Sequence, residues 1–101
     1  MPLEVVHTDV WGPTKTASIH GYRYYVSFID DHTRKVWVYF MKQKREVFRH
    51  FKRFKATVEK EIGKKIKTLR SDGGGEYFSN EFSDFLQKSG IHRQFSCRYT
   101  Q

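Results

Sequence analysis

Two aspartates, Asp9 and Asp72, stand where short strand-like runs give way to turns, a setting in which a carboxylate can do chemistry. Asp72 follows the run at residues 68–71 and precedes three consecutive glycines. Glycines carry no side chain, so a bulky anionic substrate can approach Asp72 closely, although Asp-Gly is equally a common turn pair. Asp9 also ends a partly β-branched run and precedes a Trp-Gly-Pro turn. Two carboxylates positioned by rigid strands therefore form a candidate site.

The composition favours a folded, basic domain that binds a polyanion. The chain has 101 residues, of which 17% are aromatic, and a net charge of +8 at pH 7. Such a charge attracts nucleic acid at long range, while the alternative is a generally solvated basic surface. The single cysteine, Cys97, excludes an internal disulfide and a cysteine-rich zinc site. With no signal peptide and no apolar run long enough for a membrane span, we expect an intracellular, soluble protein with no membrane partner.

The hydrophobic spacing predicts one α/β domain. Alternating residues indicate strands over 3–10, 22–29 and 35–41, which we expect to pair antiparallel in series. Three- and four-residue spacing then predicts an amphipathic helix over 44–62, stopped near Gly63. A strand over 65–71, a short helix capped by Ser79 or Asn80, and a strand over 91–97 complete the order β-β-β-α-β-α-β. A crossover helix normally leads to parallel pairing of the strands that it joins.

Four motifs carry a resemblance to a known family. They are HTDVWGP at residues 7–13, FIDDHTR at 28–34, LRSDGGGEY at 69–77 and GIHRQFS at 90–96. In this order they resemble the integrase catalytic core of retroelements, most closely that of copia-type LTR retrotransposons. The resemblance implies a ribonuclease-H-like α/β fold with a mixed five-stranded sheet, in which the first and fourth strands lie side by side. Residues 1–101 then correspond to a partial integrase catalytic core that lacks the family's C-terminal helices.

The resemblance also assigns the two aspartates. Asp9 and Asp72 match the first two members of the family's Asp-Asp-Glu triad, which implies that both are catalytic and bind Mg²⁺ or Mn²⁺. The implied reaction is metal-dependent polynucleotidyl transfer in DNA integration. The family's third ligand is a glutamate further along than Gln101, so we expect the fragment to be inactive alone. Glu76 is a conceivable substitute, but a role in ordering the loop is the favoured interpretation.

Basic residues in and after the long helix are the candidate nucleic-acid contacts: Arg45, Arg49, Lys52, Arg53, Lys64, Lys65 and Lys67. The implied partners are DNA and a second copy of the chain, and the family implies a nuclear location. The alternative function is a small basic module that binds nucleic acid without catalysis, which a requirement for divalent ions would discriminate.

Three further residues near the motifs are given structural roles. His7 is expected to point away from Asp9. Asp30 and Asp31 are expected to form local turn hydrogen bonds or to pair with Arg34.

Overall fold

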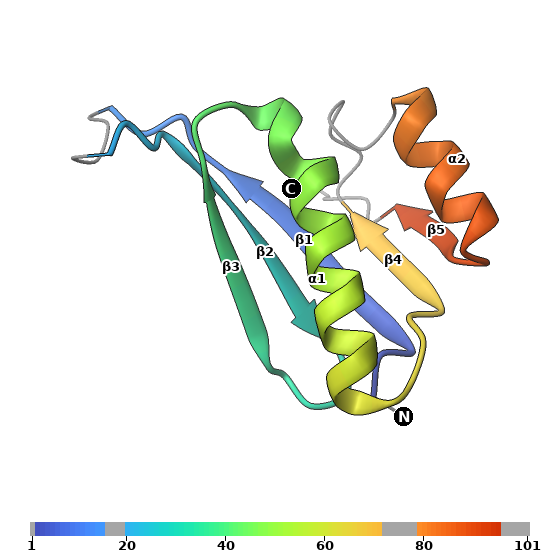
Figure 1. The fold of residues 1–101 in the computed structure, drawn as a ribbon. Coiled ribbons are helices and arrows are strands. Elements are labelled where there is room, and N and C mark those ends of the chain that lie inside the picture. The colour runs from blue at the N-terminus through green and yellow to red at the C-terminus, as the bar shows by residue number, and fades with distance from the viewer. Residues whose placement is uncertain (1, 16–19, 72–78, 96–101) are drawn as a thin grey trace, which may run out of the picture.

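The computed structural model describes residues 2–15, 20–71 and 79–95 (Figure 1). The strands are β1 (Val5–Trp11), β2 (Tyr24–Asp30), β3 (Val36–Met41), β4 (Thr68–Ser71) and β5 (His92–Phe95). The helices are η1 (Lys44–Glu46), α1 (Val47–Ile62) and α2 (Asn80–Lys88). This order confirms the predicted β-β-β-α-β-α-β. The elements are shorter than expected, because β1 and β4 begin later and the start of the predicted long helix is a 3₁₀ turn.

The five strands form one mixed sheet with the order β3-β2-β1-β4-β5. β1 pairs antiparallel with β2, and β2 with β3, as the serial hairpins predict. β4 pairs parallel with β1 on one side and with β5 on the other. The crossover through α1 therefore returns the chain to β1, so that the first and fourth strands lie side by side.

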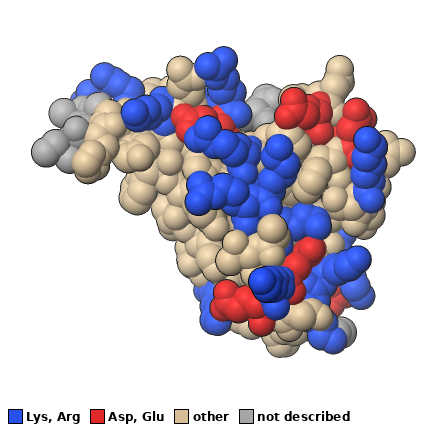
Figure 2. All heavy atoms as spheres, viewed as in Figure 1, with Lys and Arg blue, Asp and Glu red and all other residues tan. Residues whose placement is uncertain are grey.

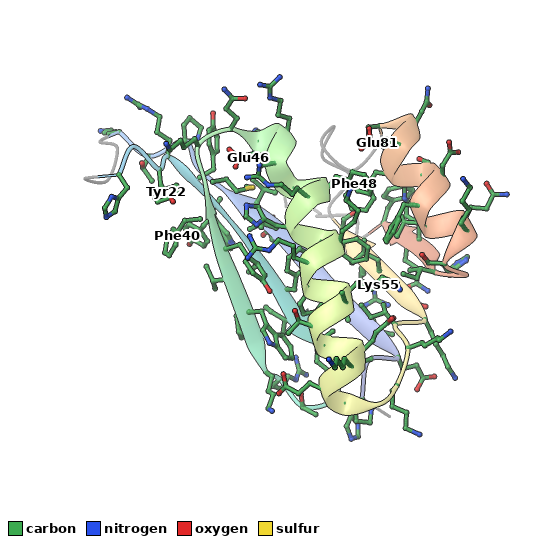
Figure 3. All side chains as sticks on the ribbon, viewed as in Figure 1. Tyr22, Phe40, Glu46, Phe48, Lys55 and Glu81 are labelled. Atoms are coloured by element: carbon green, nitrogen blue, oxygen red, sulfur yellow. The ribbon has the colours of Figure 1, made fainter. Side chains whose placement is uncertain are left out.

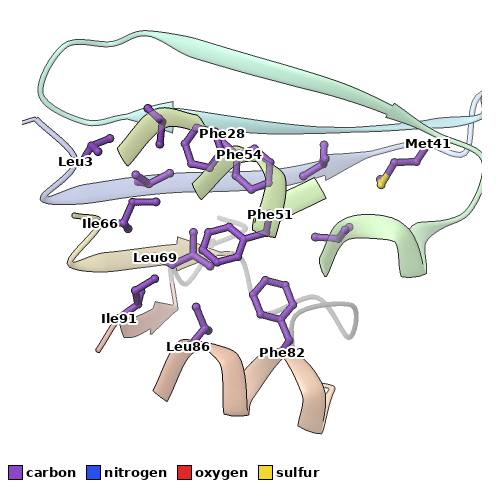
Figure 4. Packing of buried hydrophobic residues seen from close by; sticks show 14 residues of the cluster. Leu3, Phe28, Met41, Phe51, Phe54, Ile66, Leu69, Phe82, Leu86 and Ile91 are labelled. Carbon is purple, nitrogen blue, oxygen red and sulfur yellow. The ribbon is translucent and has the colours of Figure 1, made fainter. Parts of the chain in front are cut away.

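The core lies between the sheet and α1, whose aromatic face is buried. Phe28 of β2 stacks on Phe54 of α1 with ring centroids 4.5 Å apart and planes 9° apart. The ring centroids of Phe51 and Phe82 lie 5.4 Å apart, so α2 packs onto the same core. Figure 4 shows these rings in one layer with Leu69 and Ile91 from the sheet side. All four phenylalanines are fully buried, so the apolar face of the predicted amphipathic helix packs into the core.

Both helix ends follow the signals expected from the sequence. α1 ends at Gly63, whose φ of 78° lies in the left-handed region that favours glycine. The Gly63 amide donates to the carbonyl of Glu59 at 2.9 Å. At the start of α2, the Ser79 hydroxyl accepts a hydrogen bond from the Phe82 amide at 3.1 Å.

The face of the sheet opposite to α1 carries exposed apolar side chains in the described part of the chain. Trp11, Val38 and Phe40 are 46%, 45% and 61% exposed, respectively. Trp11 is aligned with Tyr25, which is aligned with Phe40, so these aromatic residues form a row across three strands. An apolar face of this kind favours association, and self-association of the chain stays a prediction.

The stack between α1 and β2 predicts unequal effects of two phenylalanine substitutions. Phe54→Ala should lower the free energy of unfolding by about 3–5 kcal/mol, because it removes a buried ring and leaves a cavity. Phe40→Ala, at an exposed position on β3, is the matched control and should cost much less. Denaturant unfolding of both variants measures the difference, and equal costs would contradict the burial described here.

Candidate functional site

Asp9 lies on β1. This strand pairs with β2 on one side and with β4, which follows α1, on the other. Asp9 is half-buried and aligned with Ser27 of β2. Its Oδ1 atom accepts a hydrogen bond from the amide of Val10 at 3.0 Å. β1 thus holds the carboxylate on a rigid, paired segment, as the candidate site requires.

Asp72 and Glu76 lie outside the described residues. The nearest described position is Ser71, the buried last residue of β4. The parallel register aligns Val5 with Thr68 and His7 with Arg70, so each β4 residue is numbered 63 above its partner in β1. This constant offset is the geometric relation between the strand that carries Asp9 and the strand that leads to Asp72.

The expectation that His7 points away from Asp9 was wrong. Residues two positions apart on a strand lie on the same face, and β1 is paired without interruption from Val6 to Trp11. His7 Nε2 lies 2.9 Å from Oδ1 of Asp31. The hydrogen bond with His7 comes first among the interactions that lower the pKa of Asp31, ahead of the charges of Arg34 and Arg70. Asp31 therefore makes its first contact with His7 of β1, and the charge of Arg34 acts on it in addition.

Asp30 does more than form a local turn. Its Oδ2 atom accepts from the hydroxyl of Thr33 at 2.7 Å, which is the expected local contact, but its Oδ1 atom accepts from the amide of Leu3 at 3.0 Å. Burial raises the pKa of Asp30, but hydrogen bonds from Thr33, Leu3 and His32 outweigh this effect and hold the pKa below its ordinary value. Asp30 is fully buried and ties the segment before β1 to the end of β2.

The predicted basic contacts are all exposed. Arg45 lies in η1, and Arg49, Lys52 and Arg53 lie on α1, while Lys64, Lys65 and Lys67 lie in the segment between α1 and β4. Figure 2 shows Lys and Arg side chains gathered over α1. Lys52 lies above the ring of Phe48, with Nζ 4.4 Å from the centroid. Arg49, Lys52 and Arg53, which we call the cationic strip, thus lie on the side of α1 away from the core.

A pocket of about 590 Å³ opens beside the first turns of α1. We call it the α1 pocket. Its charged walls are Lys42, Arg45, Arg49, Arg53 and Glu46, and His50 also lines it. The place of His50 between Val47 and Phe54, on the apolar side of the helix, predicts burial. His50 is 6% exposed.

The described residues contain no ready-made metal cage and no membrane span. Among residues 2–15, 20–71 and 79–95, no three His, Cys, Asp or Glu side chains gather closely enough to bind a metal ion. No helix in that part of the chain has the length and hydropathy needed to cross a membrane.

Comparison with known sequences gives a match over the full length. A family model described as the integrase core domain matches residues 1–101. The chain is 49% identical over 92 residues to the retrovirus-related Pol polyprotein from transposon TNT 1-94 of Nicotiana tabacum, covering 91% of this chain and 7% of that protein. It is 44% identical over 99 residues to the Pol polyprotein from transposon RE2 of Arabidopsis thaliana, covering 98% of this chain and 7% of that protein. The chain thus spans less than a tenth of the length of these relatives.

Solved structures with low sequence identity share the fold. A chain of the simian T-cell lymphotropic virus intasome, in complex with PP2A regulatory subunit B56 gamma, matches with a TM-score of 0.74 at 16% identity. The match covers 99% of this chain and 34% of that one. The HTLV-2 integrase catalytic core domain, in complex with magnesium in a trimeric form, matches with a TM-score of 0.69 at 19% identity, over 95% of this chain and 61% of that one. The fold is therefore ribonuclease-H-like, as the sequence analysis expects.

The buried Asp30 carboxylate predicts a pH-dependent contribution to stability. Because its pKa is lowered in the folded state, the contribution is present above the ordinary value of 3.8 and is lost as the pH falls through the folded value. Asp30→Ala should lower the free energy of unfolding by about 1–3 kcal/mol near neutral pH, since it leaves buried donors unpaired.

Denaturant unfolding of the parent and Asp30→Ala across pH measures this contribution. The difference should shrink in acid below pH 3.8. Asp31→Ala, at an exposed position, is the control with the smaller effect. A difference that stays constant with pH would show that the ionised carboxylate is not the source.

Proposed function

This chain belongs to the integrase core domain family, in the form found in copia-type retrotransposons, and we propose that it supplies the first two carboxylates of a DNA-integration site. In this proposal Asp9 and Asp72 bind a divalent ion and act on phosphodiester bonds of DNA. The matching relatives are Pol polyproteins, and the chain covers 7% of the one from transposon TNT 1-94, so we assign the complete reaction to a polyprotein of that kind.

The observation that carries the proposal is the register between β1 and β4. In each pair, the residue number in β4 is 63 higher than the residue number in β1. Asp72 likewise follows Asp9 by 63 positions. Continued by two residues beyond the observed pairs, this register would align Asp9 with Asp72. Because side chains at paired positions of adjacent strands lie on the same face, this register supports a shared site for the two aspartates.

The chemistry of the two residues fits Mg²⁺ or Mn²⁺. Carboxylates are the hard oxygen ligands that these ions prefer. A bound ion would activate an attacking oxygen and stabilise a leaving oxygen in phosphodiester displacement. Asp9 and Asp72 would hold the ion, and the rigid pairing of β1 with β2 would fix the position of Asp9. The magnesium named for the HTLV-2 integrase core supports this choice of ion.

DNA is the proposed partner because the surface charge is suitable. The net charge of +8 and the cationic strip over α1 favour binding to phosphates through release of counterions. The strip also supports a second candidate function, a basic module that binds nucleic acid without catalysis. The two functions differ in one respect, since only the first requires that divalent ions bind at Asp9 and Asp72.

Thermal melts with and without Mn²⁺ test the metal site. An ion that binds the folded chain raises its stability by mass action, by about 2.7 kcal/mol when its concentration is one hundred times Kd. Mn²⁺ should therefore raise the Tm of the parent, and Asp9→Asn and Asp72→Asn should each lose most of that gain. Without metal, neither variant should be less stable than the parent, because each removes repulsion between like charges.

The matched control is Asp84→Asn, an exposed aspartate on α2. It should keep the full gain from Mn²⁺. An unshifted parent would mean that no two-aspartate site forms in this chain and would favour the non-catalytic module. Equal shifts in all four proteins would mean that Mn²⁺ binds elsewhere.

A further inference from the structure

We propose that the α1 pocket binds a phosphate group of a nucleic acid strand, at a site separate from Asp9 and Asp72. This inference rests on the proposed nucleic-acid function and names a specific contact point for it. The pocket volume of about 590 Å³ falls within the range of roughly 300–1,000 Å³ that is usual for ligand sites. It therefore has room for a phosphate and part of the adjoining sugar.

The charged walls of the pocket select an anion. Four cationic side chains line it, namely Lys42, Arg45, Arg49 and Arg53, against the single carboxylate of Glu46. Glu46 is already engaged, because its Oε2 atom accepts from the amides of Lys42 at 2.9 Å and Gln43 at 2.8 Å, and its Oε1 atom accepts from Arg49. These contacts, acting against burial, keep the pKa of Glu46 below its ordinary value. The excess positive charge is thus left for a bound anion, and arginine forks suit phosphate oxygens.

His50 provides the second, independent observation. It lines the pocket and is more than nine-tenths buried, and neither ring nitrogen has a hydrogen-bond partner among the described residues. Its Nε2 atom lies 3.9 Å from Oε1 of Glu46, which is too far for a hydrogen bond. Buried polar groups in folded proteins normally have a partner. Both ring nitrogens are enclosed, so a phosphate oxygen in the pocket would accept from the N–H group of the neutral imidazole after a small displacement of the side chains that cover the ring.

The surroundings of His50 favour the neutral imidazole, which can donate one hydrogen bond. Burial lowers the pKa of His50, and the charges of Arg49 and Arg53 lower it further against the opposing effect of Glu46. The ring also stacks on Tyr39, with centroids 5.3 Å apart. A neutral imidazole offers one donor and adds no charge, so the arginines supply the attraction and His50 supplies direction.

An aromatic edge beside the cations points to nucleic acid as the source of the phosphate. Tyr22 and Phe40 also line the pocket, with ring centroids 6.2 Å apart, and Phe40 is 61% exposed. Figure 3 shows these two side chains on the strand side and Glu46 at the start of the helix. Exposed aromatic rings next to a cationic groove are typical of sites that hold a strand by its backbone and stack its bases. A free phosphate ion would not use this edge.

Ring signals of His50 in ¹H–¹⁵N spectra of the chain, titrated with inorganic phosphate, test the pocket directly. The signals should shift in a saturable way. Arg49→Gln combined with Arg53→Gln should abolish the shift, and both positions are exposed, so the fold should be retained. The control removes two positive charges outside the pocket, by Arg34→Gln combined with Lys60→Gln, and should keep the shift.

Binding of duplex DNA across a salt series tests the source of the phosphate. If both arginines hold one phosphate, the pocket double variant should lose about one unit of the log-log salt slope, and the control pair should lose less. Unmoved His50 signals, with DNA binding intact, would overturn the pocket and leave the proposed function standing. A shift with phosphate but no DNA binding at low salt would overturn the nucleic-acid assignment and the proposed function together.

Discussion

The packing of Phe54 against Phe28 is the contact on which the arrangement of the candidate site depends. α1 can bury its aromatic face only by lying across the sheet, and the stack with β2 fixes where it lies. A helix that crosses the sheet returns the chain in the original direction, so β4 enters parallel to β1 and beside it. The register of Asp9 relative to the end of β4 is thus a consequence of core packing.

The same helix separates two kinds of electrostatic environment. The buried face of α1 is apolar, while its outer face and first turns carry arginines and lysines. The carboxylate of Asp9 lies on the face of β1 opposite the buried Val6 and Thr8. This separation is physically useful, because cations that attract a polyanion do not neutralise the carboxylates proposed to bind a metal ion. One amphipathic helix therefore contributes to the core, carries the cationic strip and forms one wall of the α1 pocket.

Local patterns predicted most of the fold, and long-range contacts account for what they missed. The spacing of Phe51, Phe54 and Val58 predicted α1, since helical period and burial depend on neighbours in sequence. The role of Asp30 was missed, because its bond to the Leu3 amide joins residues far apart in the chain. The prediction that His7 points away from Asp9 was wrong, because residues two positions apart lie on the same face of a strand. The α1 pocket could not be predicted, because residues from the end of β3 and the start of α1 form it together.

In the proposed site, the parallel pairing of β1 with β4 brings Asp9 and Asp72 to one divalent ion. Paramagnetic broadening of backbone amide signals by Mn²⁺ locates a bound ion. We expect the signals of Val10 and Ser71, which adjoin the two aspartates in sequence, and of Ser27, which is aligned with Asp9, to broaden first. Gly63, at the far end of α1, should stay sharp. Broadening centred on Glu46 or Asp31, with Val10 and Ser71 unaffected, would contradict the two-strand site.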